Sequence, residues 1–140
     1  MKSGPALRQL TAHRAIHDAA HGQAVTLTEQ LKEHFYHKEE DACYELVKQL
    51  ITHWEEKIIA HADAEDHGLY KELLEEGNVP EKDLYMLMRD HDLFRKIVAH
   101  IKKLFAEKDT VDVELISIFQ SLLLINHFHH LGEEETLFPS

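Results

Sequence analysis

Three histidines in this sequence are each followed, four residues later, by a glutamate: His61 by Glu65, His129 by Glu133, and His130 by Glu134. Residues four apart lie on one face of an α-helix, so each pair places an imidazole beside a carboxylate. Such pairs occur on solvated helix surfaces. They also form metal sites, because imidazole nitrogen and carboxylate oxygen are both ligands of transition metals.

The first of these pairs continues an apolar stripe. Leu50, Trp54 and Ile58 precede His61 and Glu65 at spacings of three and four residues. This helical periodicity predicts that the pair faces the interior of the fold. A buried carboxylate is costly without a cationic partner, and no lysine or arginine lies nearby on this stripe. A metal ion would supply the missing positive charge.

The same arrangement recurs 68 residues later in the chain. His129 and Glu133 correspond to His61 and Glu65, and both pairs follow an apolar stripe. The repeat therefore favours His129 and Glu133 over the adjacent pair that begins at His130. The adjacent register stays open, because the preceding segment is apolar around much of its circumference.

Two other segments each place a histidine before an apolar stripe. His17 and His91 are both followed by aspartate and then by apolar residues at helical spacing. His21 lies one turn after His17 near the same inward stripe, so both are candidate ligands. His37 is an alternative outer ligand, although a histidine in a solvated loop is the favoured interpretation. Two inward His-x-x-x-Glu pairs, with histidines from the other helices, are typical of two-metal carboxylate sites in helix bundles.

Long helices must hold these side chains, because helix breakers are scarce. The chain has five glycines and three prolines among 140 residues. Apolar periodicity predicts four helices: residues 5–35, a second that follows a break within 34–41 and ends at Gly77, a third that opens at Pro80, and a fourth that is capped by Asp109 or Thr110 and ends before Pro139. No alternating strand pattern is present. We therefore expect an all-α fold, an antiparallel up-and-down four-helix bundle, in a single domain spanning residues 1–140.

The composition excludes several classes of function. A formal net charge of -11, with 26 acidic residues, opposes a nucleic-acid partner. The single cysteine, Cys43, excludes an internal disulfide and any multi-cysteine zinc or iron-sulfur site. The sequence shows no signal-peptide pattern and no apolar run of about 18 residues, so no membrane partner is expected. These features predict a cytoplasmic protein.

The sequence resembles the hemerythrin-like, or HHE, cation-binding domains, which are four-helix bundles around a non-haem di-iron centre. The resemblance covers residues 10–139, and its most specific part is HHLGEEETLFP at residues 129–139. HADAEDHGLY, at residues 61–70, matches the same motif without its proline. The resemblance implies seven metal ligands, with the two glutamates bridging the metals: His17, His21, His61, Glu65, His91, His129 and Glu133.

The resemblance also implies a cofactor and a range of functions. The expected cofactor is two iron ions, and the ligand types equally suit manganese or zinc. Oxygen-carrying hemerythrins have a second histidine four residues after the one at His91, whereas this chain has Arg95 there. An open coordination position would bind dioxygen, nitric oxide or peroxide, as in a carrier, sensor or iron store. The alternatives are a redox enzyme that reduces peroxide or nitric oxide or repairs iron-sulfur centres, and a metal-free helical interaction domain. No dedicated acid or base stands out, which favours binding.

In the metal-free chain, desolvation would raise the pKa of a buried carboxyl such as Glu133.

Overall fold

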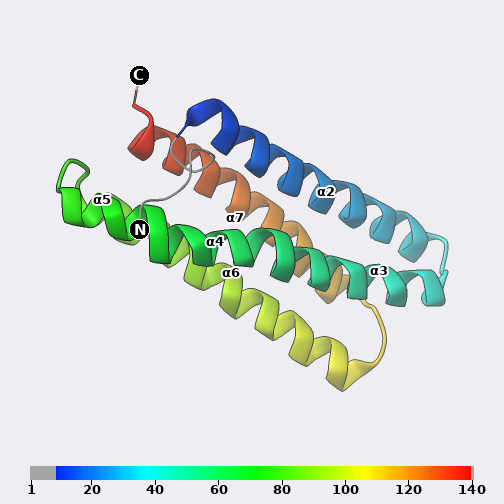
Figure 1. Ribbon diagram of the computed structural model, residues 1–140. Helices are drawn as coiled ribbons and strands as arrows, with labels where there is room; N and C mark the ends of the chain where they lie inside the picture. Colours follow the sequence, from blue (N-terminus) through cyan, green and yellow to red (C-terminus); the bar gives the residue numbers. More distant parts are fainter. Residues whose placement is uncertain (1–8, 140) are drawn as a thin grey trace.

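The computed structural model describes residues 9–139, which form four long helical segments and contain no strand (Figure 1). The first segment is α2 (Leu10–Tyr36), and the third and fourth are α6 (Glu81–Lys108) and α7 (Val113–Leu137). The second segment is a continuous run of α3 (Glu40–His53), η1 (Trp54–Ile59), α4 (Ala60–Ala64), η2 (Glu65–Leu69) and α5 (Tyr70–Glu76). The predicted all-helical fold class is confirmed.

Most of the predicted helix boundaries are confirmed. The break between the first two helical segments falls at residues 37–39, inside the predicted range. Gly77 ends the second segment with φ 73°, a left-handed conformation that glycine adopts without the steric cost of a Cβ. α6 follows directly after Pro80. The predicted start of the first helix at residue 5 lies outside the described residues.

The predicted cap of the fourth helix is wrong. Asp112, rather than Asp109 or Thr110, caps α7, and its side chain accepts a hydrogen bond from the Leu115 backbone nitrogen at 3.0 Å. Asp109 instead ends α6 in a left-handed conformation with φ 54°. A residue used in this way as a C-cap leaves the next helix to start further along the chain.

The second segment contains two π-helical turns that the sequence did not indicate. η1 precedes His61, and η2 begins at Glu65. Each turn widens the helix and changes the direction in which the following side chains point. Short π-helical turns of this kind are frequent at functional sites.

The core consists of two apolar clusters separated by a polar layer. On α7 the order along the chain is Leu122 in the larger cluster, then His129 and Glu133, then Leu137 beside the smaller cluster. Along the second segment and along α6, polar residues likewise lie between residues of the two apolar clusters. The polar layer is therefore enclosed by apolar side chains along the bundle. The larger cluster draws on all four helical segments, with these buried side chains among its members: Leu27, Leu31, Leu50, Trp54, Phe94, Ile101, Phe119 and Leu122.

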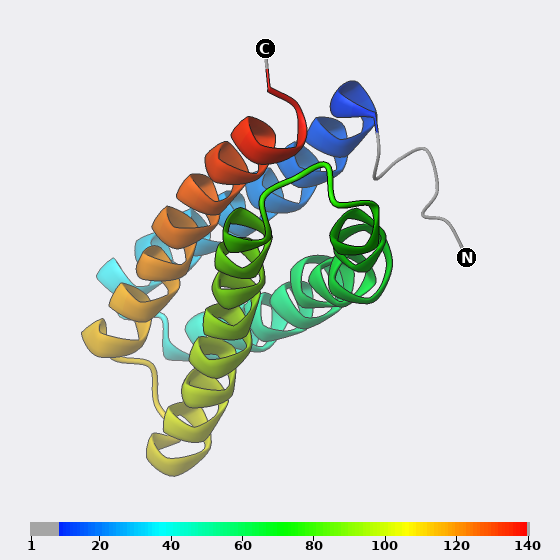
Figure 2. The same cartoon turned by 90° about the vertical axis from the view of Figure 1, so that its left-hand side faces the viewer.

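The four segments pack along one another. α2 contacts α3 and α7, and α6 contacts α7 and the second segment at η1, α3 and α5. The turn from α2 to α3 and the connection from α6 to α7 lie at one end of the molecule, and the turn from α5 to α6 lies at the other (Figure 1). Figure 2 shows α7 beside both α2 and α6. None of the helices within residues 9–139 has the length and apolarity that a membrane span requires.

Candidate metal centre

Two groups of histidines and glutamates meet inside the polar layer. In each group, one nitrogen or oxygen atom from every residue lies within 4.8 Å of the others. Glu65 belongs to both groups, so they form one continuous site. Group A is His13, His17, His61 and Glu65, and group B is Glu65, His91, His129 and Glu133.

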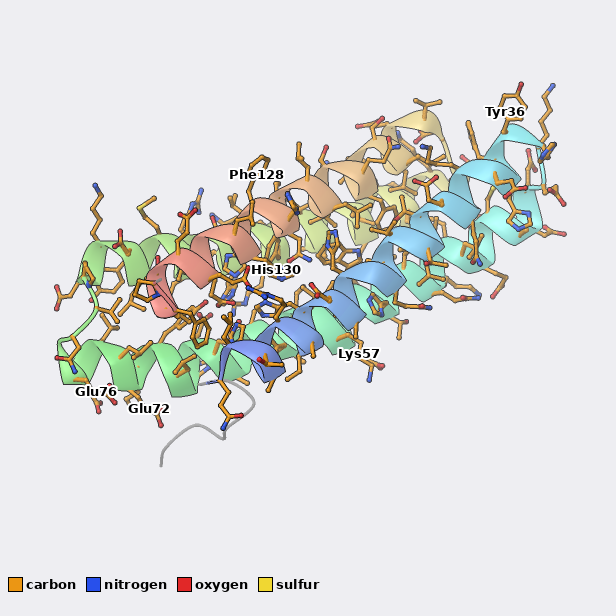
Figure 3. All side chains as sticks on the ribbon, turned by 90° about the horizontal axis from the view of Figure 1, so that it is seen from above. Tyr36, Lys57, Glu72, Glu76, Phe128 and His130 are labelled. Carbon is orange, nitrogen blue, oxygen red and sulfur yellow. The ribbon has the colours of Figure 1, made fainter. Side chains whose placement is uncertain are left out.

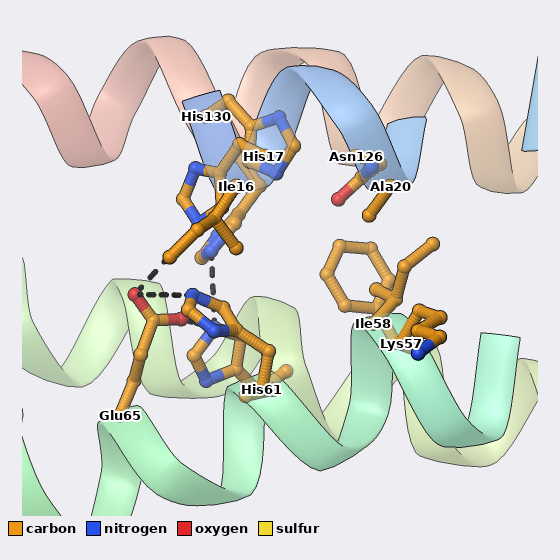
Figure 4. A pocket seen from close by; sticks show the side chains of 13 residues that line it. Ile16, His17, Ala20, Lys57, Ile58, His61, Glu65, Asn126 and His130 are labelled. Carbon is orange, nitrogen blue, oxygen red and sulfur yellow. Dashed lines mark hydrogen bonds and ion pairs between the residues drawn. The ribbon is translucent and has the colours of Figure 1, made fainter. Parts of the chain in front are cut away.

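Glu65 turns its two oxygens toward different histidines. Its Oε2 lies 3.4 Å from His13 Nε2 and 3.9 Å from His17 Nε2. The same oxygen is 3.6 Å from His61 Nε2 (Figure 4). Its Oε1 lies 3.4 Å from His91 Nε2 in group B. This carboxylate therefore faces the histidines of both groups.

Glu133 also directs its two oxygens toward different histidines. Its Oε1 lies 2.5 Å from His13 Nε2 and 3.3 Å from His17 Nε2. Its Oε2 lies 3.8 Å from His129 Nε2 and accepts a hydrogen bond from the Tyr70 hydroxyl. Each of the two carboxylates thus faces both histidine groups, and both are almost completely buried, Glu65 at 1% exposure and Glu133 at 0%.

Two aspartates orient the histidines of group B. His91 Nδ1 donates to Asp66 Oδ1 at 2.8 Å, and His129 Nδ1 donates to Asp90 Oδ2 at 2.8 Å. Both rings therefore turn Nε2 toward the centre, where the two Nε2 atoms lie 3.1 Å apart. Arg95 holds Asp66 in place through a 2.6 Å ion pair. Carboxylates that bind the outer nitrogen of a metal-ligating histidine fix its tautomer and its orientation in this way.

Two polar atoms of the site are buried without a hydrogen-bond partner among the described residues. They are His61 Nε2 and Glu65 Oε2, which lie 3.6 Å apart in group A. An unsatisfied buried polar atom is expensive and indicates a missing water or ion. The donor set of imidazoles and carboxylates, without thiolate, fits iron, manganese or zinc. The residues present therefore fit a metal site.

The surroundings shift the pKa values of several of these groups. Burial lowers the pKa of His17 to about 2, so its imidazole is neutral and can bind a cation. Burial also disfavours charge on His91, but hydrogen bonds to Asp66 and Glu65 outweigh it and raise its pKa to about 9. A metal ion would have to displace that proton.

The pKa expected for Glu133 from burial alone is wrong in direction. Burial does act to raise the pKa of this carboxyl, but hydrogen bonds to His13 and Glu65, together with the nearby imidazoles, hold it well below its usual value. A cluster of imidazoles thus keeps Glu133 ionised in the metal-free chain. Tyr70, which is buried against Glu133 and Glu65, has its pKa raised well above the usual value and stays protonated.

The structure brings six of the seven candidate ligands into the two groups and places His21 outside them. His21 Nδ1 accepts a hydrogen bond from Asn126 Nδ2 at 3.0 Å, on the outer side of the site. His13, one turn before His17, lies in group A instead and is completely buried. The His-x-x-x-His spacing on this helix was visible in the sequence, but periodicity did not show which of the outer histidines faces inward.

The adjacent register on α7 also lies outside the two groups. His130 stacks on His17 with ring centroids 3.9 Å apart, between α7 and α2 (Figure 3). Glu134 makes an ion pair with Arg14 at 2.5 Å near the surface. His37 is exposed at the end of α2, far along the helix from the other candidates.

A small cavity adjoins both groups. Its volume is about 20 Å³, enough for one water-sized molecule. Apolar side chains line it together with five residues of the two groups and three further polar residues (Figure 4). The five are His17, His61, Glu65, His91 and His129. The three further polar residues are Lys57, Asn126 and His130, and the apolar lining includes Ile58 and Phe94.

Comparisons of this chain with protein-family models, with curated proteins and with solved structures found no match. The fold and the site by themselves define a helical protein whose buried cluster of histidines and glutamates can hold a metal ion.

Proposed function

We propose that this protein is a hemerythrin-like di-iron protein, an antiparallel up-and-down four-helix bundle that binds dioxygen, nitric oxide or iron as a carrier, sensor or store. The observation that carries the proposal is the orientation of two buried carboxylates. Glu65 and Glu133 each direct one oxygen toward the histidines of group A and the other toward group B. Carboxylates that project inward from different helices and are shared by two ions are typical of di-iron sites in helix bundles.

The two metal positions have unequal ligand sets. His13, His17 and His61 would hold one ion, and His91 and His129 the other, with Glu65 and Glu133 shared between them. Group B would thus supply fewer imidazoles to its ion and would leave more positions open to a small ligand. Iron bound there would supply affinity for small oxygen or nitrogen molecules. The apolar clusters on both sides exclude bulk water from the site.

Metal analysis tests this proposal. The protein is purified metal-free, reconstituted with ferrous iron in the absence of oxygen, desalted and analysed for iron per chain. We expect two irons per chain, and Mössbauer spectra with two different iron environments.

E65Q should lose tight binding at both positions, because both groups share this carboxylate, whereas H37Q on the exposed end of α2 should keep both irons. One iron or fewer in the unmutated chain would refute the proposal. No metal at all would favour a helical interaction domain.

A redox enzyme is the second candidate, and one observation favours it. The Tyr70 hydroxyl donates a hydrogen bond to Glu133, and its ring stacks on His91 with centroids 5.4 Å apart. A phenol in that place can deliver a proton or an electron to a molecule bound at the metals. Steady-state assays with peroxide and with nitric oxide separate the candidates. Turnover that falls in Y70F at unchanged iron content would establish the enzyme, and stable adducts without turnover would establish the binding protein.

A further inference from the structure

Asn126 is a buried amide whose oxygen has no hydrogen-bond partner among the described residues. The side chain is 1% exposed, and among the described residues nothing donates to its Oδ1. Its Nδ2 donates to His21 Nδ1 at 3.0 Å. In this arrangement the amide nitrogen faces His21 and the amide oxygen faces inward. A buried carbonyl oxygen without a donor is costly, so its presence calls for a donor that arrives from elsewhere.

The internal repeat shows that this position is apolar in the other half of the chain. The offset of 68 residues that matches His129 with His61 also matches Asn126 with Ile58. Both residues line the small cavity beside the metal groups. An isoleucine satisfies the packing there, so the packing of the bundle does not by itself require an amide at residue 126.

The free oxygen of Asn126 faces the cavity that the metal ligands also line. This cavity has a volume of about 20 Å³, and it is also lined by His17, His61, His91 and His129. Figure 4 shows the Asn126 oxygen turned toward the interior of the bundle rather than toward its surface. A small molecule in this cavity would lie beside ligating residues of both groups and beside Asn126.

We propose that Asn126 selects the small molecule that binds beside the metals, by accepting a hydrogen bond from it through Oδ1. This inference rests on the proposed di-iron centre and narrows its ligands, because it favours hydrogen-bearing molecules over the dioxygen and nitric oxide named for that centre above. Water and hydrogen peroxide carry a hydrogen that they can donate to this oxygen. Dioxygen and nitric oxide carry none, and their lone pairs would face those of the amide oxygen. The site therefore favours hydrogen-bearing oxygen ligands over bare diatomic molecules.

The test compares two probes in three proteins. Asn126→Leu removes the acceptor and keeps the number of side-chain heavy atoms, and Ile58→Leu is the matched control at the equivalent position of the repeat. Each protein is loaded with ferrous iron without oxygen, and its iron content is measured first. The first probe is hydrogen peroxide, followed by stopped-flow absorbance as one H₂O₂ and two protons oxidise two ferrous ions and yield two waters. The second probe is nitric oxide, whose affinity is measured by optical titration.

We expect Asn126→Leu to lower the apparent affinity for hydrogen peroxide about 2- to 12-fold, which is the effect of one hydrogen bond. Its affinity for nitric oxide should be unchanged or higher. Ile58→Leu should change both probes by the same factor. The metal-free Asn126→Leu protein should melt no lower than its parent, because it no longer buries an unsatisfied oxygen.

Three results would overturn the inference alone. In the first, Asn126→Leu keeps two irons and responds to both probes as its parent does. In the second, Asn126→Leu loses affinity for both probes equally. In the third, the metal-free Asn126→Leu protein melts well below its metal-free parent. The last two would show that Asn126 acts only in packing. A parent chain that takes up no iron would overturn the proposed function, and this inference with it.

Discussion

Removing the metal should lower the free energy of unfolding, and the buried polar atoms of the site indicate by how much. Without an ion, His61 Nε2 and Glu65 Oε2 are buried and have no hydrogen-bond partner among the described residues. Such atoms cost roughly 1–3 kcal/mol each, so the two together cost about 2–6 kcal/mol. A metal that binds only the folded chain adds about 4 kcal/mol at a thousand times its Kd. For a chain of this length that corresponds to a rise in Tm of roughly 12 °C.

Replacing one of the two atoms makes the prediction specific. His61→Leu removes the unpartnered nitrogen and adds apolar volume, so the metal-free variant should melt no lower than its metal-free parent. It should also gain less from iron, because group A loses one of its three imidazoles. A hundredfold weaker Kd would remove about 2.7 kcal/mol of the stabilisation, or roughly 8 °C.

Thermal melts followed by circular dichroism measure all four states: parent and His61→Leu, each with chelator and with ferrous iron under nitrogen. Equal melting temperatures of the parent with and without iron would refute the reasoning. So would a metal-free His61→Leu protein that melts far below its parent, since that nitrogen would then be making a stabilising contact.

Three further predictions concern ligands and their supports. His13→Ala should lose iron from group A while His21→Ala keeps two irons per chain, and elemental analysis that gives the reverse order would return His21 to the ligand set. His129→Ala should likewise lose iron and His130→Ala largely keep it; equal losses would mean that the stacked His130 is also a ligand. Asp66→Asn should weaken iron binding about 10- to 100-fold without abolishing it, because the aspartate orients a ligand rather than binding the metal. A competition titration with a chelator measures that change, and an unchanged Kd would contradict the role assigned to Asp66.

The sequence alone was enough to predict the helical class and most of the residues that the structure brings together in the candidate site. Helical periodicity and scarce breakers predicted the four segments, and spacing within one helix predicted which residues share a face. His61 with Glu65 and His129 with Glu133 were found in this way, because each pair lies four residues apart on a single helix. The 68-residue repeat then chose between His129 and His130, a choice that agrees with the burial of His129 and the outer position of His130.

Only the tertiary structure decided what depends on contacts between helices. Periodicity shows that residues four apart share a helical face but not how that face is rotated toward the other helices. His13 and His21 are both one turn from His17, and the packing of α2 against α7 placed the first with Glu133 and the second with Asn126. The low pKa of Glu133 has the same origin: burial is a property of one residue, but the imidazoles that outweigh it come from other positions in space as well as from its own helix. Sequence spacing fixes geometry within a helix, and the rotation of the helices about their axes fixes which side chains meet.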